Sequence, residues 1–120
     1  MKNAINWFEI PASNFDRAVT FYNIILNTEL HREVIAGIPN AIFPNEGDEA
    51  VGGSVVLNPQ LSPSSQGSTV YLNAGGDMTV IYGRIIAAGG QCLTPIIDFP
   101  FGKMAFFLDT EGNRVGLHTT

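Results

Sequence analysis

The feature that most constrains the fold is a structural pattern that occurs twice along the chain. A strand-like run at Ile5–Ile10 leads into an amphipathic helix at Phe15–Leu26. The same order returns in the second half, where Thr69–Ala74 precedes an amphipathic helix at Met78–Ala88. Short strand-like runs follow each helix. Two βαβββ modules in one short chain predict an α+β fold with its cavity between the halves.

Composition restricts the class of protein. The 120 residues are 45% hydrophobic and only 14% charged, which predicts one globular domain over residues 1–120. The net charge of −5 argues against a nucleic-acid partner, because no basic stripe is present to neutralise phosphates. No apolar run approaches the roughly 18 residues that span a bilayer, and no signal-peptide pattern opens the chain. Cys92 is the single cysteine, so we expect no internal disulfide and a cytoplasmic protein.

Both predicted helices have recognisable end signals. Ser13–Asp16 fits a capping box, in which side chains satisfy the unpaired N–H groups of the first turn, and Asn27 is a suitable stop. Asp77 is a favourable N-cap for the second helix. Gly89–Gly90 can adopt the left-handed conformation that closes it.

Turn residues divide the rest of the chain into strands. The predicted strands are Glu29–Ala36, Asn40–Phe43 and Val51–Asn58 in the first half, and Gln91–Ile97, Lys103–Asp109 and Arg114–Thr119 in the second. The segment 59–67 is rich in Pro, Ser and Gly and falls at the midpoint. We therefore expect a first module at about 1–58, this linker, and a second module at about 68–120.

Three parts of the sequence resemble one known family. Trp7–Pro11, followed by Asp16–Ala18 and Phe21–Tyr22, resembles the opening strand and helix of the vicinal oxygen chelate superfamily. Ala87–Gly90 resembles the end of its second helix, and Leu108–His118 resembles its closing hairpin. The superfamily includes glyoxalases, bleomycin-resistance proteins and extradiol dioxygenases. Because this scaffold hosts many reactions, the resemblance indicates the fold more strongly than the chemistry.

The resemblance implies a partly open mixed β-barrel that, in metal-dependent members, holds a divalent ion through His, Glu or Gln on the first, fourth, fifth and eighth strands. The corresponding positions here are Trp7, Val56, Thr69 and Gly116, with Val70 as the alternative to Thr69. We favour Thr69, because Val70, Leu72 and Ala74 form the better helix-facing row. Three of the four positions lack a usable side-chain donor, so no metal and no other cofactor is expected.

Strand alternation predicts which side chains face the cavity instead. The candidate ligand-binding residues are Trp7, Glu9, Asn58, Tyr71, Asn73, Phe101 and His118. Trp7 is the strongest of them, because it occupies a metal-ligand position and must point inward. Its ring either fills the cavity or forms one wall of a pocket whose polar floor is Glu9, Asn73 and His118. Tyr71, as a second wall, favours the pocket.

Glu9 and His118 are the candidate catalytic residues. A carboxylate beside an imidazole sets the tautomer and basicity of a histidine that acts as a general base. The alternatives are a structural carboxylate at Glu9 with a frayed His118, or a displaced divalent metal site formed by both residues and Asn58. His31 is expected at the surface, and Cys92 is expected to be unreactive.

These observations predict a metal-independent protein that binds a small organic molecule in an aromatic-lined cavity, as the drug-sequestering relatives do. Two other classes stay open: an enzyme of the lyase, isomerase or dioxygenase kind, and an interaction or regulatory subunit whose cavity is filled. The resemblance and the open edges of short sheets also predict a homodimer without nucleic-acid or membrane partners.

Overall fold

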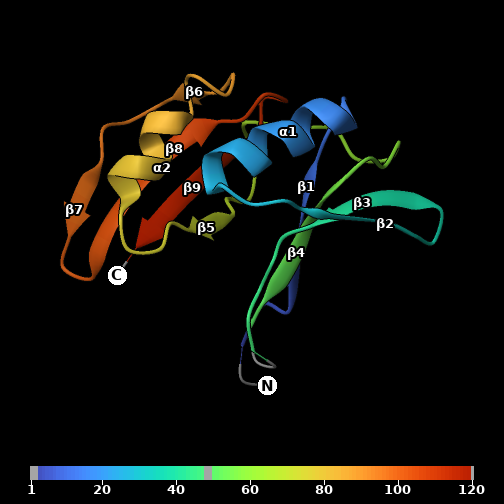
Figure 1. Cartoon of the computed structure of the whole chain (residues 1–120), viewed down its shortest axis with the longest axis horizontal. Coiled ribbons are helices and arrows are strands. Elements are labelled where there is room, and N and C mark those ends of the chain that lie inside the picture. Colours follow the sequence, from blue (N-terminus) through green and yellow to red (C-terminus); the bar gives the residue numbers. More distant parts are fainter. Residues whose placement is uncertain (1–2, 48–49, 120) are drawn as a thin grey trace.

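The computed structural model, which describes residues 3–47 and 50–119, contains two modules that lie side by side (Figure 1). The first comprises β1 (Trp7–Pro11), α1 (Phe15–Leu26), β2 (His31–Ile35), β3 (Ile38–Ile42) and β4 (Gly52–Val56). The second comprises β5 (Tyr71–Asn73), α2 (Met78–Arg84), β6 (Gln91–Cys92), β7 (Ile97–Phe99), β8 (Gly102–Leu108) and β9 (Arg114–Thr119). The two predicted βαβββ modules are confirmed, with the strand predicted at Gln91–Ile97 divided between β6 and β7.

Each module builds its own mixed sheet. The strand order of the first sheet is β1-β4-β3-β2, and β1 runs parallel to β4. The order of the second is β5-β9-β8-β6, with β7 beside β8 and with β5 parallel to β9. β1 and β5 therefore occupy equivalent edges. The α+β class is confirmed, and within the described residues the two sheets stay separate rather than closing into one barrel.

Helix α1 packs against both sheets because its buried face carries rings in two directions. The ring centroid of Phe21 lies 5.8 Å from that of Phe107 in β8, and Tyr22 lies 5.5 Å from Phe43, which follows β3. Both predicted bounds of α1 are confirmed. Asn27 ends the helix in the left-handed conformation, with a φ of 49°, as its position in the sequence indicated.

Helix α2 is shorter than predicted. Asp77 is the N-cap, as expected, and accepts a hydrogen bond from the Thr79 N–H at 3.0 Å. The regular α-helix ends at Arg84 rather than at Ala88, and turns carry the chain on to Gly89. The next residue must be small, because a Cβ at Gly90 would lie 2.7 Å from Cε1 of Phe21. This close approach brings the end of the second helix against α1.

The turn between β8 and β9 holds the N-terminus of α1. The carboxylate of Glu111, whose side chain is 0% exposed, accepts hydrogen bonds from the Ser13 N–H at 3.0 Å and the Asn14 N–H at 2.7 Å. Arg17 Nε donates to the same carboxylate at 2.7 Å. The Asn14 N–H is the first of the backbone N–H groups that a helix start leaves without an intrahelical partner, and a negative charge is favourable at this end of a helix. Glu111 therefore caps a helix of the other module.

The predicted capping box at Ser13–Asp16 is wrong in its partners. Asn14 is the N-cap residue, and its Oδ1 accepts from the Arg17 N–H at 3.1 Å. The Ser13 hydroxyl donates to Glu111 instead, at 3.1 Å. Asp16 points away from the helix end and pairs with Arg32 at 2.6 Å. Glu111, which is distant in sequence, therefore accepts hydrogen bonds at the start of α1 in place of Asp16.

A second carboxylate of the same turn, Asp109, is buried and extends the contact. The Tyr22 hydroxyl donates to Asp109 Oδ2 at 2.6 Å. Asn113 Nδ2 donates to Asp109 at 3.0 Å and to the Pro11 carbonyl at 2.7 Å. Burial, and then the Asp109 charge, raise the pKa of Tyr22, which therefore stays a hydrogen-bond donor. The turn thus binds both β1 and α1 of the first module.

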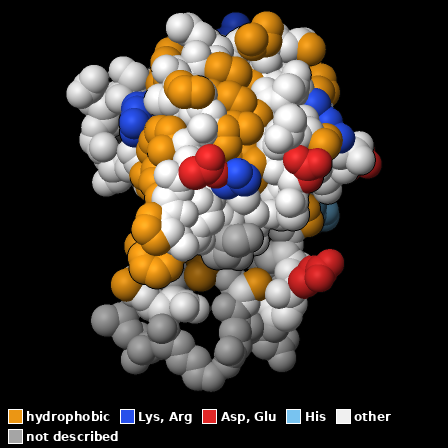
Figure 2. All heavy atoms as spheres, turned by 90° about the vertical axis from the view of Figure 1, so that its left-hand side faces the viewer, with side chains coloured by type: hydrophobic (Ala, Val, Ile, Leu, Met, Phe, Trp, Pro, Cys, Tyr) orange, Lys and Arg blue, Asp and Glu red, His pale blue; other side chains and the backbone are white. Residues whose placement is uncertain are grey.

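Both ends of the molecule expose apolar side chains. The β2–β3 hairpin extends away from the rest of the fold (Figure 1), and every residue of β2 is exposed. At the opposite end, Figure 2 shows hydrophobic side chains spread over the second module, with charged groups at separate points. Neither α1 nor α2 has the length and hydrophobicity of a membrane-spanning helix.

The Glu111 contact predicts a pH-dependent stability. Burial alone would raise the pKa of Glu111, but the hydrogen bonds from Arg17 and the start of α1 outweigh it and lower the pKa from 4.5 to about 2. A depressed folded pKa stabilises the protein above about pH 4.5, and this stabilisation is lost as the pH falls toward 2. Glu111→Gln should lower the free energy of unfolding by on the order of 3 kcal/mol at pH 7, measured by urea denaturation.

The difference in the free energy of unfolding between the wild type and Glu111→Gln should shrink as the pH falls from 4.5 toward 2. Glu29→Gln, which removes an exposed carboxylate, is the matched control and should change neither stability nor its pH dependence. A Glu111→Gln deficit that stays constant across this pH range would contradict the electrostatic role.

Candidate functional site

A cleft of about 930 Å³ lies where the two modules meet. Its walls come from the start of β1, the end of α1, the β3–β4 connection and the segment around β5. The first module contributes Trp7, Leu26, Phe43 and Val51, and the second contributes Val70, Tyr71 and Ile81. Its size lies within the range of small-molecule sites, which is roughly 300–1,000 Å³.

Two aromatic rings face this cleft, one from each module. Trp7 of β1 is 42% exposed and Tyr71 of β5 is 51% exposed. Each ring lies against a glycine of the neighbouring strand. A Cβ at Gly52 would be 2.8 Å from Trp7 Cζ3, and one at Gly116 would be 2.6 Å from Tyr71 Cδ2. The glycines therefore let both rings lie flat on their sheets while one side of each stays accessible.

The chemistry of the cleft is apolar with a few neutral polar groups. Asn27, Thr28, Ser68, Thr69 and Asn73 supply amide and hydroxyl groups. None of the lining residues that the structure describes is an Asp, Glu, His, Lys or Arg. This arrangement can bury a planar apolar molecule and orient it by hydrogen bonds, but it offers no acid–base pair.

In β1 and β5, the alternate side chains predicted to face the core do so in the structure. Leu72 and Ala74 are buried in the core, and Val70 packs against it. Thr69, Tyr71 and Asn73 therefore lie on the opposite face of this segment, and residues of both faces line the cleft. In β1, Ile10 is buried in the core whereas Trp7 is not. The Trp7 ring forms a wall of the cleft and does not fill it.

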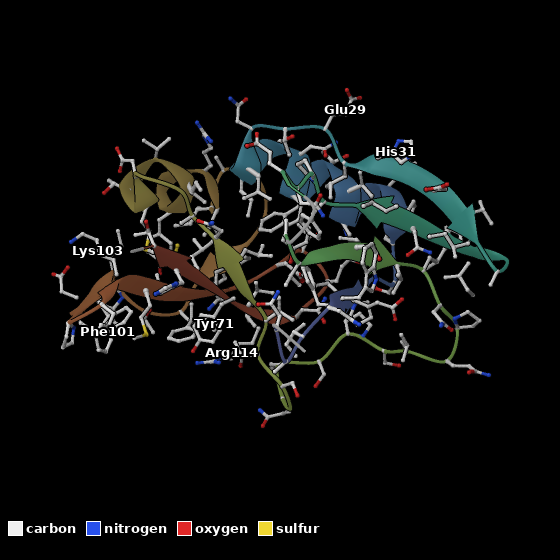
Figure 3. All side chains as sticks on the ribbon, turned by 90° about the horizontal axis from the view of Figure 1, so that it is seen from below. Glu29, His31, Tyr71, Phe101, Lys103 and Arg114 are labelled. Atoms are coloured by element: carbon white, nitrogen blue, oxygen red, sulfur yellow. The ribbon has the colours of Figure 1, made fainter. Side chains whose placement is uncertain are left out.

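Four of the predicted ligand-binding residues do not line the cleft. Glu9 is exposed on β1. Asn58 Oδ1 accepts from the Gln60 N–H at 3.0 Å. Phe101 is 78% exposed at the far end of its module (Figure 3), and the ring of His118 lies 5.4 Å from that of Phe99. Of the predicted polar floor, only Asn73 lines the cleft.

The proposed acid–base pair is not formed in this structure. Glu9 and His118 make no hydrogen bond or ion pair with each other, and no hydrogen bond joins either to Asn58. Instead, His118 borders a separate small pocket of about 170 Å³ with Tyr71 and Asn73. The geometry gives Glu9 no means of setting the tautomer of His118.

The strand register corrects one of the four metal-ligand positions. The Ala12 N–H bonds to the Val56 carbonyl as the Ala74 N–H bonds to the His118 carbonyl, both at 2.9 Å. Val56 therefore corresponds to His118 by the internal repeat. The residue that corresponds to Gly116 is Ser54, which is buried and donates to Asn40 Oδ1 at 2.7 Å. The same register relates Thr69 to Trp7, as predicted.

The residues at these positions do not fit a divalent cation. Trp7 and Gly116 offer no side-chain ligand, and the Ser54 hydroxyl is bonded to Asn40. The Thr69 hydroxyl accepts a hydrogen bond from Arg114 Nη1 at 3.0 Å, which places a positive charge at the fourth position. Within residues 3–47 and 50–119, no three His, Cys, Asp or Glu side chains converge where they could hold a metal.

Sequence reasoning missed the residues that the first module adds beyond Trp7. Leu26, Phe43 and Val51 line the cleft because it opens at the edges of two sheets, and strand alternation identifies only sheet faces. Arg114 was also missed. Strand register could have identified Arg114. It begins β9, the strand next to β5, and lies opposite Thr69.

A family model described as "Glyoxalase/Bleomycin resistance protein/Dioxygenase superfamily" matches residues 4–117. The chain therefore belongs to this superfamily, as the resemblance of its strand, helix and hairpin motifs implied. A search of curated proteins gave no match.

Solved structures share the fold at low sequence identity. A glyoxalase/bleomycin resistance protein from Albidiferax ferrireducens T118 has a TM-score of 0.75 at 14% identity, over 98% of this chain and 99% of that chain. One from Streptomyces sp. CB03234 has a TM-score of 0.67 at 22% identity, over 96% and 99%. A glyoxalase I mutant from Zea mays has a TM-score of 0.71 at 19% identity, and the match covers 94% of this chain and 44% of that one. Identities this low show a common fold and leave the reaction undefined.

Proposed function

We propose that this superfamily member binds a small planar organic molecule in the cleft between its modules. The observation that carries the proposal is the pair of accessible rings, Trp7 and Tyr71, which come from different modules and border the same apolar cleft. Large rings contribute most to binding when a ligand removes their faces from water. A planar ligand would bury both rings at once, and Asn73 would be available to orient it.

The lining chemistry supports binding rather than acid–base catalysis. General acid–base catalysis needs a titratable group within hydrogen-bond reach of the substrate, and the described lining residues provide only the Tyr71 phenol. The enzyme alternative that uses Glu9 and His118 has no comparable support, because the two side chains do not meet. Binding and sequestration need only shape, stacking and a few hydrogen bonds.

Neutral 2-naphthamide tests the proposal as a planar probe in equilibrium dialysis. Trp7→Ala and Tyr71→Ala should each weaken its binding by roughly tenfold, because each removes one stacking surface. Phe101→Ala is the matched control. It removes an aromatic ring that is even more exposed and lies outside the cleft, and it should leave the affinity unchanged. Binding that is insensitive to both Trp7 and Tyr71, or that falls with Phe101, would contradict the proposed site.

We also propose that binding needs no metal ion. Support comes from the side chains at the four superfamily ligand positions, which lack carboxylate and imidazole groups and include a hydroxyl bonded to Arg114. Elemental analysis of protein purified without chelator should find well below one divalent ion per chain. Near-stoichiometric zinc, nickel, iron or manganese that is lost in Glu9→Ala would contradict the proposal and restore the displaced metal site.

A homodimer remains part of the proposal. Its support is the β2 edge, where Val34 is 69% exposed on a strand that pairs only with β3 among the described strands. Sedimentation equilibrium should give a mass near twice 12.9 kDa. Val34→Lys should shift the mass toward the monomer if this edge is the contact. A wild-type mass that stays monomeric at every concentration would overturn the dimer.

A further inference from the structure

One arginine beside the cleft has no acidic partner. Arg17, Arg32 and Lys103 each form an ion pair with a carboxylate. Within the described part of the chain Arg114 has none, and neither has Arg84, whose guanidinium donates to the Ile25 carbonyl and lines neither the cleft nor its neighbouring pocket. Because a buried charge is normally paired, the partly buried guanidinium of Arg114 beside the cleft is suited to an anionic partner from outside the chain.

The guanidinium of Arg114 is held in place by neutral groups. It lies 4.2 Å from the centroid of the Phe106 ring, and its Nη1 donates to the Thr69 hydroxyl at 3.0 Å. The Arg114 backbone N–H is bonded to the Ser64 carbonyl. Stacking and this hydrogen bond orient the planar group, and among the described residues they use only one of its five N–H donors. The remaining donors are available to a ligand.

The side chain borders a small polar pocket that adjoins the cleft. This pocket, of about 290 Å³, is lined by the segment 65–69 and Arg114. Its other side chains are hydroxyl and amide groups, and no carboxylate is among the described lining residues. Ser68 and Thr69 line both the pocket and the cleft. Tyr71 and Arg114 project on the same side of the β5–β9 pair (Figure 3), and both rest against Phe106.

We propose that the Arg114 pocket binds the anionic group of a planar ligand whose ring lies in the cleft. The inference rests on the proposed function and defines its ligand class as aromatic or other planar molecules with a carboxylate or phosphate group. A guanidinium presents two parallel N–H donors that match the oxygens of either anion. The hydroxyls of Ser65 and Ser68 would complete the hydrogen bonding. The apolar cleft alone would bind a neutral ring as well as an acidic one.

Three probes that share the naphthalene ring system and differ in charge separate the contributions of ring and charge to binding. They are neutral 2-naphthamide, 2-naphthoate and 2-naphthyl phosphate, compared by equilibrium dialysis at low salt. The wild type should bind at least one anion roughly tenfold to a hundredfold more tightly than the amide. Whichever anion is preferred identifies the carboxylate or the phosphate as the natural group. Added salt should reduce the anion preference and not the affinity for the amide.

Arg114→Met should reduce the affinity for both anions to that of the amide and leave the affinity for the amide unchanged. Lys103→Met removes the same charge from an exposed site at the far end of the module (Figure 3) and should leave all three affinities as in the wild type. Arg114→Lys keeps the charge without the planar fork and should retain part of the preference. If Arg114→Met fails to fold, the anion preference of Arg114→Lys tests the proposal in its place.

The outcomes separate the two proposals. Equal affinities for amide and anions in the wild type, or an anion preference that survives Arg114→Met, would overturn the anion site and leave the cleft as a binding site. Failure of all three probes to bind would overturn both.

Discussion

The buried carboxylate of Glu111 at the N-terminus of α1 is the contact on which the rest of the structure depends. The N–H groups of Ser13 and Asn14, immediately before α1, donate to a carboxylate that belongs to the opposite module. Asp109 and Asn113, in the same turn, add bonds to Tyr22 and to the Pro11 carbonyl. These bonds join the β8–β9 turn of the second module to the end of β1 and the start of α1 in the first. The walls of the cleft come from both modules, so its shape depends on how the modules are held together.

The internal repeat explains why the cleft is lined with rings and not with metal ligands. The register equates Thr69 with Trp7 and Gly116 with Ser54, so the four superfamily ligand positions are filled by an indole, two hydroxyls and a glycine. The glycine at 116 leaves space that the Tyr71 ring occupies. Arg114 then places a positive charge where a cation would otherwise bind. The same geometry that disfavours a metal ion therefore favours an anion, and the two proposals have one structural origin.

Local signals in the sequence predicted much of the fold, and long-range contacts account for the errors. The bounds of α1 follow from its apolar spacing and Asn27, and the parity of β5 follows from the alternation of Val70, Leu72 and Ala74. The cap of α1 could not be predicted, because Ser13–Asp16 satisfies a local rule while its actual partner, Glu111, is 97 residues from Asn14. The cleft walls escaped prediction for the same reason: strand alternation assigns a residue to a face of one sheet, and the site lies between two sheets. Trp7, Tyr71 and Asn73, which alternation assigns to the cavity, also line the cleft because β1 and β5 are edge strands.

The central claim is that a ligand lies between rings of different modules with its charge on Arg114. A crystal structure of the wild-type protein with 2-naphthoate tests this most directly, because it locates ring and carboxylate together. The account predicts the naphthalene ring in the cleft, in van der Waals contact with both Trp7 and Tyr71, and a carboxylate oxygen within hydrogen-bond distance of an Arg114 nitrogen. A ligand bound beside Phe99 and His118, or in the cleft with its carboxylate turned away from Arg114, would contradict it.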